Sequence, residues 1–397
     1  MNTVFATYLC KILNRITLSH ILIFGFLLRL LALIAFPHIF LNDAHTYQLE
    51  GNLIVNHSTM RSDHCMPLYP LIAYFSGGEW KQSLLDIAFS TASIYLLYHL
   101  SYILFQKKTA ALLAALMLAI YPYSIFYSIV KITESVFVFL LLLSYFWLYK
   151  KRYFLACIAL SLLVLMRPST DLLNPLLIAT FVLVIHHESW KKAIGWILAY
   201  VMIYAALLSP WWVFNYQRYH QFVRLSPATG LMLYVGNNPL NQTGGGIHGK
   251  DANIRQFQHL DSITRDRMMT QLAIDYIKQN PWHIVKLDVK KFLRFWQPWP
   301  YAEKFKNSYT VLVSLFSYGI ILMLNIIFIF KTLKKKWSLL SPILLLILYL
   351  TAVHTVTISS IRYRYPLEPF MIIFAAYTLS EFFSAFGNIG CKRSNCK

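Results

Sequence analysis

The sequence has few charged residues for its length, and most of them carry one sign. Only 13% of the 397 residues are charged, while 57% are hydrophobic and the mean hydropathy is +0.52. Soluble chains carry about 25% charged residues. Acidic residues are scarcest, at 16 against 36 basic ones. This composition excludes an ordinary soluble domain and predicts an all-α polytopic membrane protein.

Cysteine is also scarce, and its spacing excludes two kinds of site. The five cysteines show no metal-ligand spacing, and only Cys65 falls in a long loop of the predicted outer side, so a disulfide framework is not expected. The first apolar run lacks a small-residue cleavage site and is too long for a signal-peptide core, so we expect a retained helix. Arg29 within this run is costly in lipid and should face the bundle interior or snorkel.

The formal charge of +20 could suggest a nucleic-acid partner, but the positions of the basic residues argue against one. Most basic residues form short clusters between apolar runs, as topology signals and contacts with anionic lipids do. Roughly 20 apolar residues cross a bilayer, and the sequence contains about ten runs that approach this length. They are residues 17–36, 83–105, 109–126, 132–149, 153–167, 171–186, 193–210, 308–330, 338–357 and 366–386.

Every second connection between these runs is basic, which predicts both termini on the cytoplasmic side and the other connections outside. The expected organisation is an N-terminal membrane module (1–210), an extracytoplasmic segment (211–307) and a C-terminal membrane module (308–397). The first module carries an outer loop over 37–82. Pro281 divides the helical periodicity of the outer segment into two helices.

The outer loop presents the first candidate site residues. Asp43, Tyr47 and Glu50 are spaced four and three apart, so a helix would show all three on one face. A carboxylate at the membrane boundary is a candidate general base for a substrate that lies partly in lipid. The alternative is that Asn42 or Asp43 simply caps a surface helix.

Two further candidates stand at the outer ends of apolar runs. Glu134 lies near the outer start of the run over 132–149, where the helix dipole alone would favour a carboxylate. The functional interpretation is a second acid that converges on Asp43 to position an acceptor or a cation. Arg167 ends the run over 153–167, which the dipole also favours, or it contacts a phosphate bidentately. Both pairs of alternatives remain open at this stage.

Arg362 and Arg364 lie outside, against the usual charge rule, and therefore call for an anionic partner such as a lipid head group or a polyprenyl phosphate. A structural role is the alternative for two other motifs. Tryptophans such as Trp211 commonly form a belt at the membrane interface, and the sequence Gly-Asn-Asn-Pro at 236–239 is typical of a turn. Outer histidines show no strong metal-ligand spacing, so no cofactor is specified and a divalent cation is left open. The candidate cavity residues are Tyr47, His64, Tyr69, Trp211, Asn215, Asn237 and Asn238.

Taken in order, several of these motifs resemble one family. The chain resembles the bacterial branch of the C superfamily of membrane glycosyltransferases, around family 39, which includes protein O-mannosyltransferases and the aminoarabinose transferase of lipid A. The matching pieces are Asp43-Ala44 with Tyr47, Pro67-Leu68-Tyr69-Pro70, Thr133-Glu134, Arg167-Pro168, Pro210-Trp211 with Asn215-Tyr216, Gly230 with Gly236-Asn237-Asn238-Pro239, and Arg362-Tyr363 with Pro366 and Pro369.

The resemblance implies a many-helix fold with an outward-facing cavity in a bacterial inner membrane, a polyprenyl-phosphate-linked sugar donor, and a catalytic base at Asp43. Asn42 precedes Asp43 where a metal-dependent enzyme would carry a second acid, so metal dependence is not implied. We therefore expect an inverting glycosyltransferase that acts on a hydroxyl of a lipid, glycan or protein, with Glu134 assisting and Arg167, Arg362 and Arg364 binding phosphate. The alternative is a transporter or flippase for a lipid-linked or anionic substrate, which predicts internal repeats and charges near the midplane.

Overall fold

The computed structural model describes residues 16–37, 39, 41–246, 252–301 and 307–394, and these ranges contain helices but no β-strand. The all-helical prediction is therefore confirmed for this part of the chain. The basic residues Lys11 and Arg15, which contributed to the predicted orientation, lie outside the described residues.

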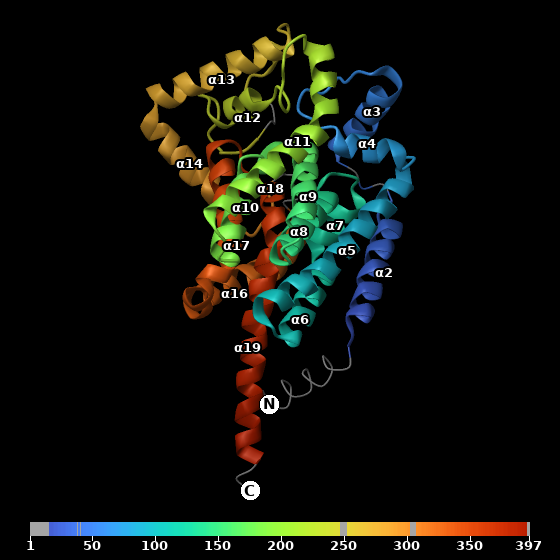
Figure 1. Ribbon diagram of the computed structural model, residues 1–397. Coiled ribbons are helices and arrows are strands. Elements are labelled where there is room, and N and C mark those ends of the chain that lie inside the picture. Colours follow the sequence, from blue (N-terminus) through green and yellow to red (C-terminus); the bar gives the residue numbers. More distant parts are fainter. Residues whose placement is uncertain (1–15, 38, 40, 247–251, 302–306, 395–397) are drawn as a thin grey trace.

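Each predicted apolar run forms a helix or a succession of helical pieces (Figure 1). These elements are α2 (Leu18–Ala35), α5 (Glu79–Phe105), α6 (Lys108–Ile120), α7 (Pro122–Ile129), α8 (Glu134–Tyr149), α9 (Tyr153–Met166), α10 (Leu173–Thr180) with a π-turn (Phe181–Ile185), α11 (Trp190–Tyr219), α15 (Ser308–Ser314) with a π-turn (Leu315–Gly319), α16 (Ile320–Phe328) with a π-turn (Ile329–Leu333), α17 (Lys334–Val356) and α19 (Glu368–Ser394).

Four helical stretches of the described chain are long and apolar enough to cross a membrane, and a fifth is added if the bent pair α6–α7 counts as one span. The pair bends by 50° where Pro122 begins α7, because proline cannot continue the hydrogen-bond ladder of the preceding helix. Helices α8, α9 and α10 with its π-turn are apolar but shorter. The expected count of about ten spans therefore stays a prediction.

Helix α11 differs from its expected end. The sequence predicted that the run beginning at 193 stops at residue 210, but α11 continues through Pro210 to Tyr219. A long apolar helix tolerates proline when neighbouring groups satisfy the freed backbone. The helix therefore carries Trp211 and Asn215 on its last turns, rather than in an irregular outer segment.

The remaining helices gather at one end of the bundle, which is the end predicted to face outward (Figure 1). They are α3 (Asn42–His57), α4 (Leu68–Phe75), α12 (Thr229–Gly236), α13 (Ser262–Gln279), α14 (Pro281–Trp296) and α18 (Ile361–Arg364). Pro281 is the first residue of α14, as the sequence predicted. Helix α2 begins and α19 ends at the opposite end of the molecule.

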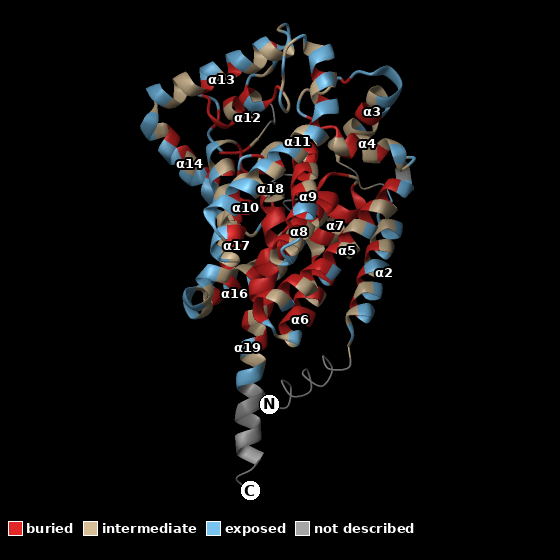
Figure 2. Cartoon of the chain, in the orientation of Figure 1, coloured by how far each residue is buried: buried red, intermediate tan, exposed pale blue. Residues whose placement is uncertain are grey.

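The core lies among α5, α6, α8, α9 and α19, where buried positions are most continuous (Figure 2). Within it, Arg29 of α2 is fully buried and faces the bundle interior, as predicted. Its guanidinium donates to the Ser90 and Ser124 hydroxyls, each at 2.8 Å, and to three backbone carbonyls. These acceptors replace water around the charge, which makes its burial tolerable.

Candidate active site

The first candidate residue, Asp43, is a side chain aimed at another segment rather than a helix cap. Helix α3 is capped by Leu41, with no side-chain hydrogen bond at the cap. Asp43 instead accepts a hydrogen bond from Arg362 Nη1 on its Oδ2 atom at 2.5 Å. Its side chain remains 46% exposed. The carboxylate is thus held by an arginine far away in the sequence while one side stays open to a substrate.

Glu134 is the second carboxylate of this group, and it is completely buried. It is the first residue of α8, after Thr133. Arg167, at the end of α9, and Arg362, in α18, both donate to Glu134 Oε1, and Arg362 Nη2 also lies 3.4 Å from Oε2. The dipole at the start of α8 favours a negative charge there, but the two guanidinium groups explain why this carboxylate can be buried.

We call Asp43, Glu134, Arg167 and Arg362 the charged cluster. It contains two acids and two bases, so its formal charge is zero. Burial lowers the pKa of the Arg362 guanidinium, but Glu134, Tyr47 and Asp43 together raise it well above its usual value. Arg362 therefore stays protonated. The Glu134 carboxylate of the cluster is buried, whereas the Asp43 carboxylate is accessible.

Two tyrosines extend from the cluster toward α5. Tyr47 lies one turn beyond Asp43, and its ring meets the Tyr69 ring edge-on with centroids 5.0 Å apart. Burial raises the pKa of Tyr47 to about 12, so its phenol is neutral at physiological pH. The Tyr69 hydroxyl donates to Asp86 Oδ2 at 2.7 Å and accepts from Gln82 at 3.1 Å. Tyr69 thereby links α4 to α5 beneath α3.

Two other predicted residues make their hydrogen bonds outside the cluster. Arg364 is fully buried; it pairs with Glu368 at 2.8 Å and donates to the carbonyls of Phe295 and Gln297. These bonds fasten the end of α14 to the membrane helices, and they give Arg364 a structural role here. His64 is exposed and lies 3.1 Å from the Ser62 hydroxyl.

Trp211 and Asn215 hold the segment that follows α11. The Trp211 indole donates to the Leu225 carbonyl at 2.7 Å, and the Asn215 amide donates to the carbonyls of Val223 and Leu225. Both side chains are buried. The returning chain is thereby folded back along the last turns of α11, and none of these bonds involves the charged cluster.

Asn237 and Asn238 join outer helices to the bundle. Asn237 donates to the Val356 carbonyl at 2.8 Å and accepts from Lys291 Nζ at 2.9 Å. Asn238 donates to the Tyr234 carbonyl at 2.9 Å. These contacts connect the end of α12 with α14 and α17. The structure therefore gathers Asp43, Glu134, Arg167 and Arg362, places Tyr47 and Tyr69 beside them, and puts the other predicted residues elsewhere.

Asp63, which the sequence did not single out, anchors the outer loop. It accepts hydrogen bonds from Arg218 and Tyr219 at 2.9 Å each, from the Ser262 hydroxyl at 2.7 Å, and from Arg265. Glu50 closes the same loop by accepting from the backbone amides of residues 61 and 62. No local spacing signals this hub, because its partners lie 155 to 202 residues further along the chain.

The described residues contain no group of three or more His, Cys, Asp or Glu side chains placed to hold a metal ion. Cys65 and Cys157 are both buried free thiols, and burial raises the pKa of Cys65 to about 11. The side chains of the cluster and its neighbour Tyr47 are carboxylates, guanidinium groups and a neutral phenol.

Comparison with known proteins identifies a similar fold but no family. No family model matches the chain, and no curated protein matches it. Among solved structures, the archaeal oligosaccharyltransferase AglB from Archaeoglobus fulgidus, in complex with an inhibitory peptide and a dolichol-phosphate, matches with a TM-score of 0.53 at 13% identity. The apo form of the Archaeoglobus fulgidus oligosaccharyltransferase matches with a TM-score of 0.56, also at 13% identity.

Both matches cover 96% of this chain but only 52% of the archaeal chain, so this chain spans about half the length of those proteins. At this identity, the likeness concerns the fold. It shows a fold similar to that of the archaeal oligosaccharyltransferase. The resemblance to the C superfamily and to the group around family 39 stays a prediction.

Proposed function

We propose that this protein is an integral membrane glycosyltransferase that moves a sugar from a polyprenyl-phosphate donor to a hydroxyl of a lipid, glycan or protein acceptor. The reaction takes place at the outer face of the membrane. The observation that carries the proposal is the convergence of Asp43, Glu134, Arg167 and Arg362 from four distant segments. The fold shared with an oligosaccharyltransferase solved with a dolichol-phosphate supports a lipid-linked donor.

Asp43 is the general base in this proposal. Its partly exposed carboxylate takes the proton from the acceptor hydroxyl as the hydroxyl oxygen attacks the anomeric carbon. The bond from that carbon to the phosphate oxygen breaks, and its electron pair leaves with the phosphate. A single displacement of this kind inverts the configuration at the sugar carbon.

The guanidinium groups of the cluster stabilise the departing phosphate. Arg362 is protonated and contacts Asp43 directly, so it lies where negative charge would grow as the bond breaks. Donors already fixed in place stabilise such charge at little reorganisation cost. When the lipid phosphate binds, it competes with Asp43 for Arg362, and this releases the carboxylate to act as a base.

Glu134 is a positioning residue in this scheme, rather than a group that touches the acceptor. Its side chain has no exposed surface, and Arg362 contacts both of its oxygens. It fixes Arg362 and Arg167 side by side. The sequence analysis expected Glu134 to orient the acceptor directly, whereas here it acts on the acceptor only through the two arginines.

The proposal is tested in cells by replacing the proposed general base with the variant Asp43→Asn. Cell-surface lipids and glycans are compared by mass spectrometry in a deletion strain carrying no gene, the wild-type gene or an Asp43→Asn variant. We expect one sugar modification to disappear on deletion, return with the wild type and return at least about 100-fold more slowly with Asp43→Asn, because general-base catalysis contributes about 10²- to 10⁴-fold. The variant should be inserted in the membrane at wild-type levels.

Asp275→Asn is the matched control, because Asp275 bonds only to Gln271 on its own helix among the contacts described. It should restore the modification fully. Full restoration by Asp43→Asn would overturn the assignment. Altered sidedness of a lipid-linked sugar, with no glycosidic bond gained or lost, would favour the transporter alternative.

A further inference from the structure

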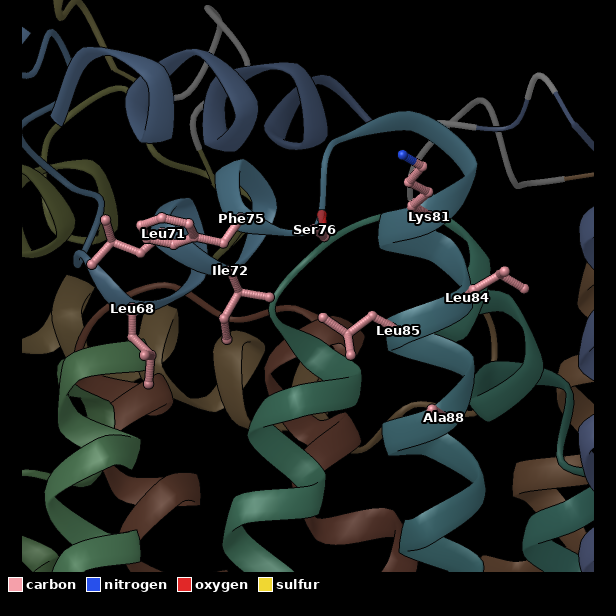
Figure 3. A pocket seen from close by; sticks show the side chains of 9 residues that line it. All are labelled: Leu68, Leu71, Ile72, Phe75, Ser76, Lys81, Leu84, Leu85 and Ala88. Carbon is pink, nitrogen blue, oxygen red and sulfur yellow. The ribbon is translucent and has the colours of Figure 1, made fainter. Parts of the chain in front are cut away.

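An apolar groove lies between α4 and α5, on the opposite side of α4 from the charged cluster's helix α3 (Figure 3). Its volume is about 720 Å³, which falls within the range of about 300–1,000 Å³ that small-molecule sites occupy. Its lining residues are Leu68, Leu71, Ile72, Phe75, Ser76, Lys81, Leu84, Leu85 and Ala88.

The groove has one charged end. Figure 3 shows the Lys81 ammonium at one end of the α5 wall and Ala88 at the other. Seven residues of helix separate them, or about 10 Å. Among the side chains that the structure describes, which do not include Glu79, no carboxylate lies within ion-pair distance of Lys81. An apolar trough with a cation at one end has the shape and charge of a site for an anionic amphiphile.

Exposed aromatic side chains fix the level of the charged end. Phe75, which lines the groove, is 74% exposed, and Trp80, next to Lys81, is 58% exposed. Tryptophan side chains such as that of Trp80 collect where a membrane meets water. Lys81 therefore stands at head-group level, and the wall toward Ala88 runs into the hydrocarbon.

Helix α4 connects the groove to the candidate active site. Tyr69 on its other side contacts Tyr47 of α3, and Gln82 of α5 lies 3.3 Å from Gln48 of α3. Gln48 is five residues beyond Asp43, about 7.5 Å along the helix. A lipid held in the groove would thus have its head group beside α3, a short distance from Asp43.

We propose that this groove is the docking site for the polyprenyl-phosphate carrier, with the isoprenoid chain along α5 and the phosphate on Lys81, before the head group moves to the charged cluster. This inference rests on the proposed function. One groove and one cation fit one chain and one phosphate, whereas a two-chain phospholipid would leave its second chain outside.

The test measures binding of a sugar-free polyprenyl phosphate to the full-length protein in nanodiscs, so that it does not depend on catalysis. A photoreactive group on the chain reports where the chain lies. With the wild-type chain, we expect the crosslinks to fall on α4 and α5. Lys81→Gln should weaken binding at least about tenfold, since hydrogen bonds to charged groups are among the stronger ones.

A second variant, Ala88→Trp, fills the hydrocarbon end of the groove while leaving Lys81 in place. Ala88 is exposed, so the fold should accept the larger side chain. It should weaken binding of the long-chain carrier but not of a short-chain phosphate. The matched controls are Lys278→Gln and Leu198→Trp, on α13 and on the exposed side of α11, and both should bind as the wild type does.

Unchanged binding in both groove variants, crosslinks elsewhere, or equal competition by phosphatidylglycerol would overturn the docking site. The two proposals fail separately. Suppose that the groove variants weaken carrier binding, but deleting the gene removes no glycosidic bond in cells. The docking site is then supported, and the glycosyltransferase assignment is wrong. If Asp43→Asn abolishes transfer while the groove variants bind the carrier normally, the glycosyltransferase assignment is supported and the docking site is wrong.

Discussion

At the residue scale, the two carboxylates that share Arg362 differ in exposure, and this difference separates their roles. Asp43 is 46% exposed and Glu134 is fully buried. A general base must reach its substrate, whereas a group that orients arginines need not. The Arg362 guanidinium can therefore hold the accessible carboxylate of Asp43 while the buried carboxylate of Glu134 holds the guanidinium in place.

This division predicts that two isosteric changes both remove transfer but differ in their effect on stability. Glu134→Gln leaves two guanidinium groups without their shared counter-charge, and removing one partner of a buried pair costs about 3–5 kcal/mol. We expect a clear loss of thermal stability, measured by unfolding in detergent, together with loss of transfer. Asp43→Asn should remove transfer with little change in the melting temperature. Equal stability of the two variants would contradict the assignment of Glu134 as the positioning residue.

At the scale of elements, the position of Asp43 depends on how closely α3 approaches α4. A Cβ atom at Gly51 would lie 2.1 Å from the Pro70 carbonyl oxygen, which is a clash with backbone. Glycine is required here because only a residue without a side chain lets the two helices meet. The contact fixes the helix that carries Asp43 and Tyr47.

Gly51→Ala should therefore push α3 away from α4 and displace Asp43. A shift of about 1 Å in a catalytic group can cost about 100-fold in rate, so we expect transfer to fall by that order while the protein still inserts. Gly195→Ala in α11 is the control, since nothing lies within 4 Å of its added Cβ; it should retain full transfer. The measurement is the initial rate of sugar transfer in membranes that contain equal amounts of each variant.

At the scale of the whole molecule, α3, α12 and α13 lie at one end, and α6 and the end of α19 lie at the other (Figure 1). Asp43 of the charged cluster belongs to α3. The basic connections predict which end faces the cytoplasm. This sidedness remains a prediction, because the length of a helix does not determine the direction in which it crosses the membrane.

Cysteine labelling tests the sidedness directly. In a background with Cys10, Cys391 and Cys396 replaced by serine, an impermeant thiol reagent applied to intact cells should label His45→Cys and Lys278→Cys. It should label Lys108→Cys and Lys151→Cys only after the membrane is opened. All four positions are exposed, so the opposite pattern would place the cluster in the cytoplasm and remove the outer-face reaction.

The sequence by itself determined the class and the helices, and it supplied the candidates from which the charged cluster is drawn. Apolar runs predicted helices because a backbone in lipid must satisfy its own hydrogen bonds. Pro281 predicted a boundary between two helices because proline lacks a backbone N–H. Arg29 predicted a side chain that faces inward or snorkels because a charge in lipid is costly. Asp43, Glu134, Arg167 and Arg362 were selected from their positions at predicted outer ends.

Only the tertiary structure decided which of these residues meet. Arg362 and Arg364 looked equivalent in the sequence, but residues two apart on a helix do not face the same side. The short helix α18 thus turns Arg362 toward Asp43 and Arg364 toward Glu368. Asp63 joins partners far along the chain, and α11 continues past Pro210. Such pairings depend on how distant helices pack, which local spacing does not encode.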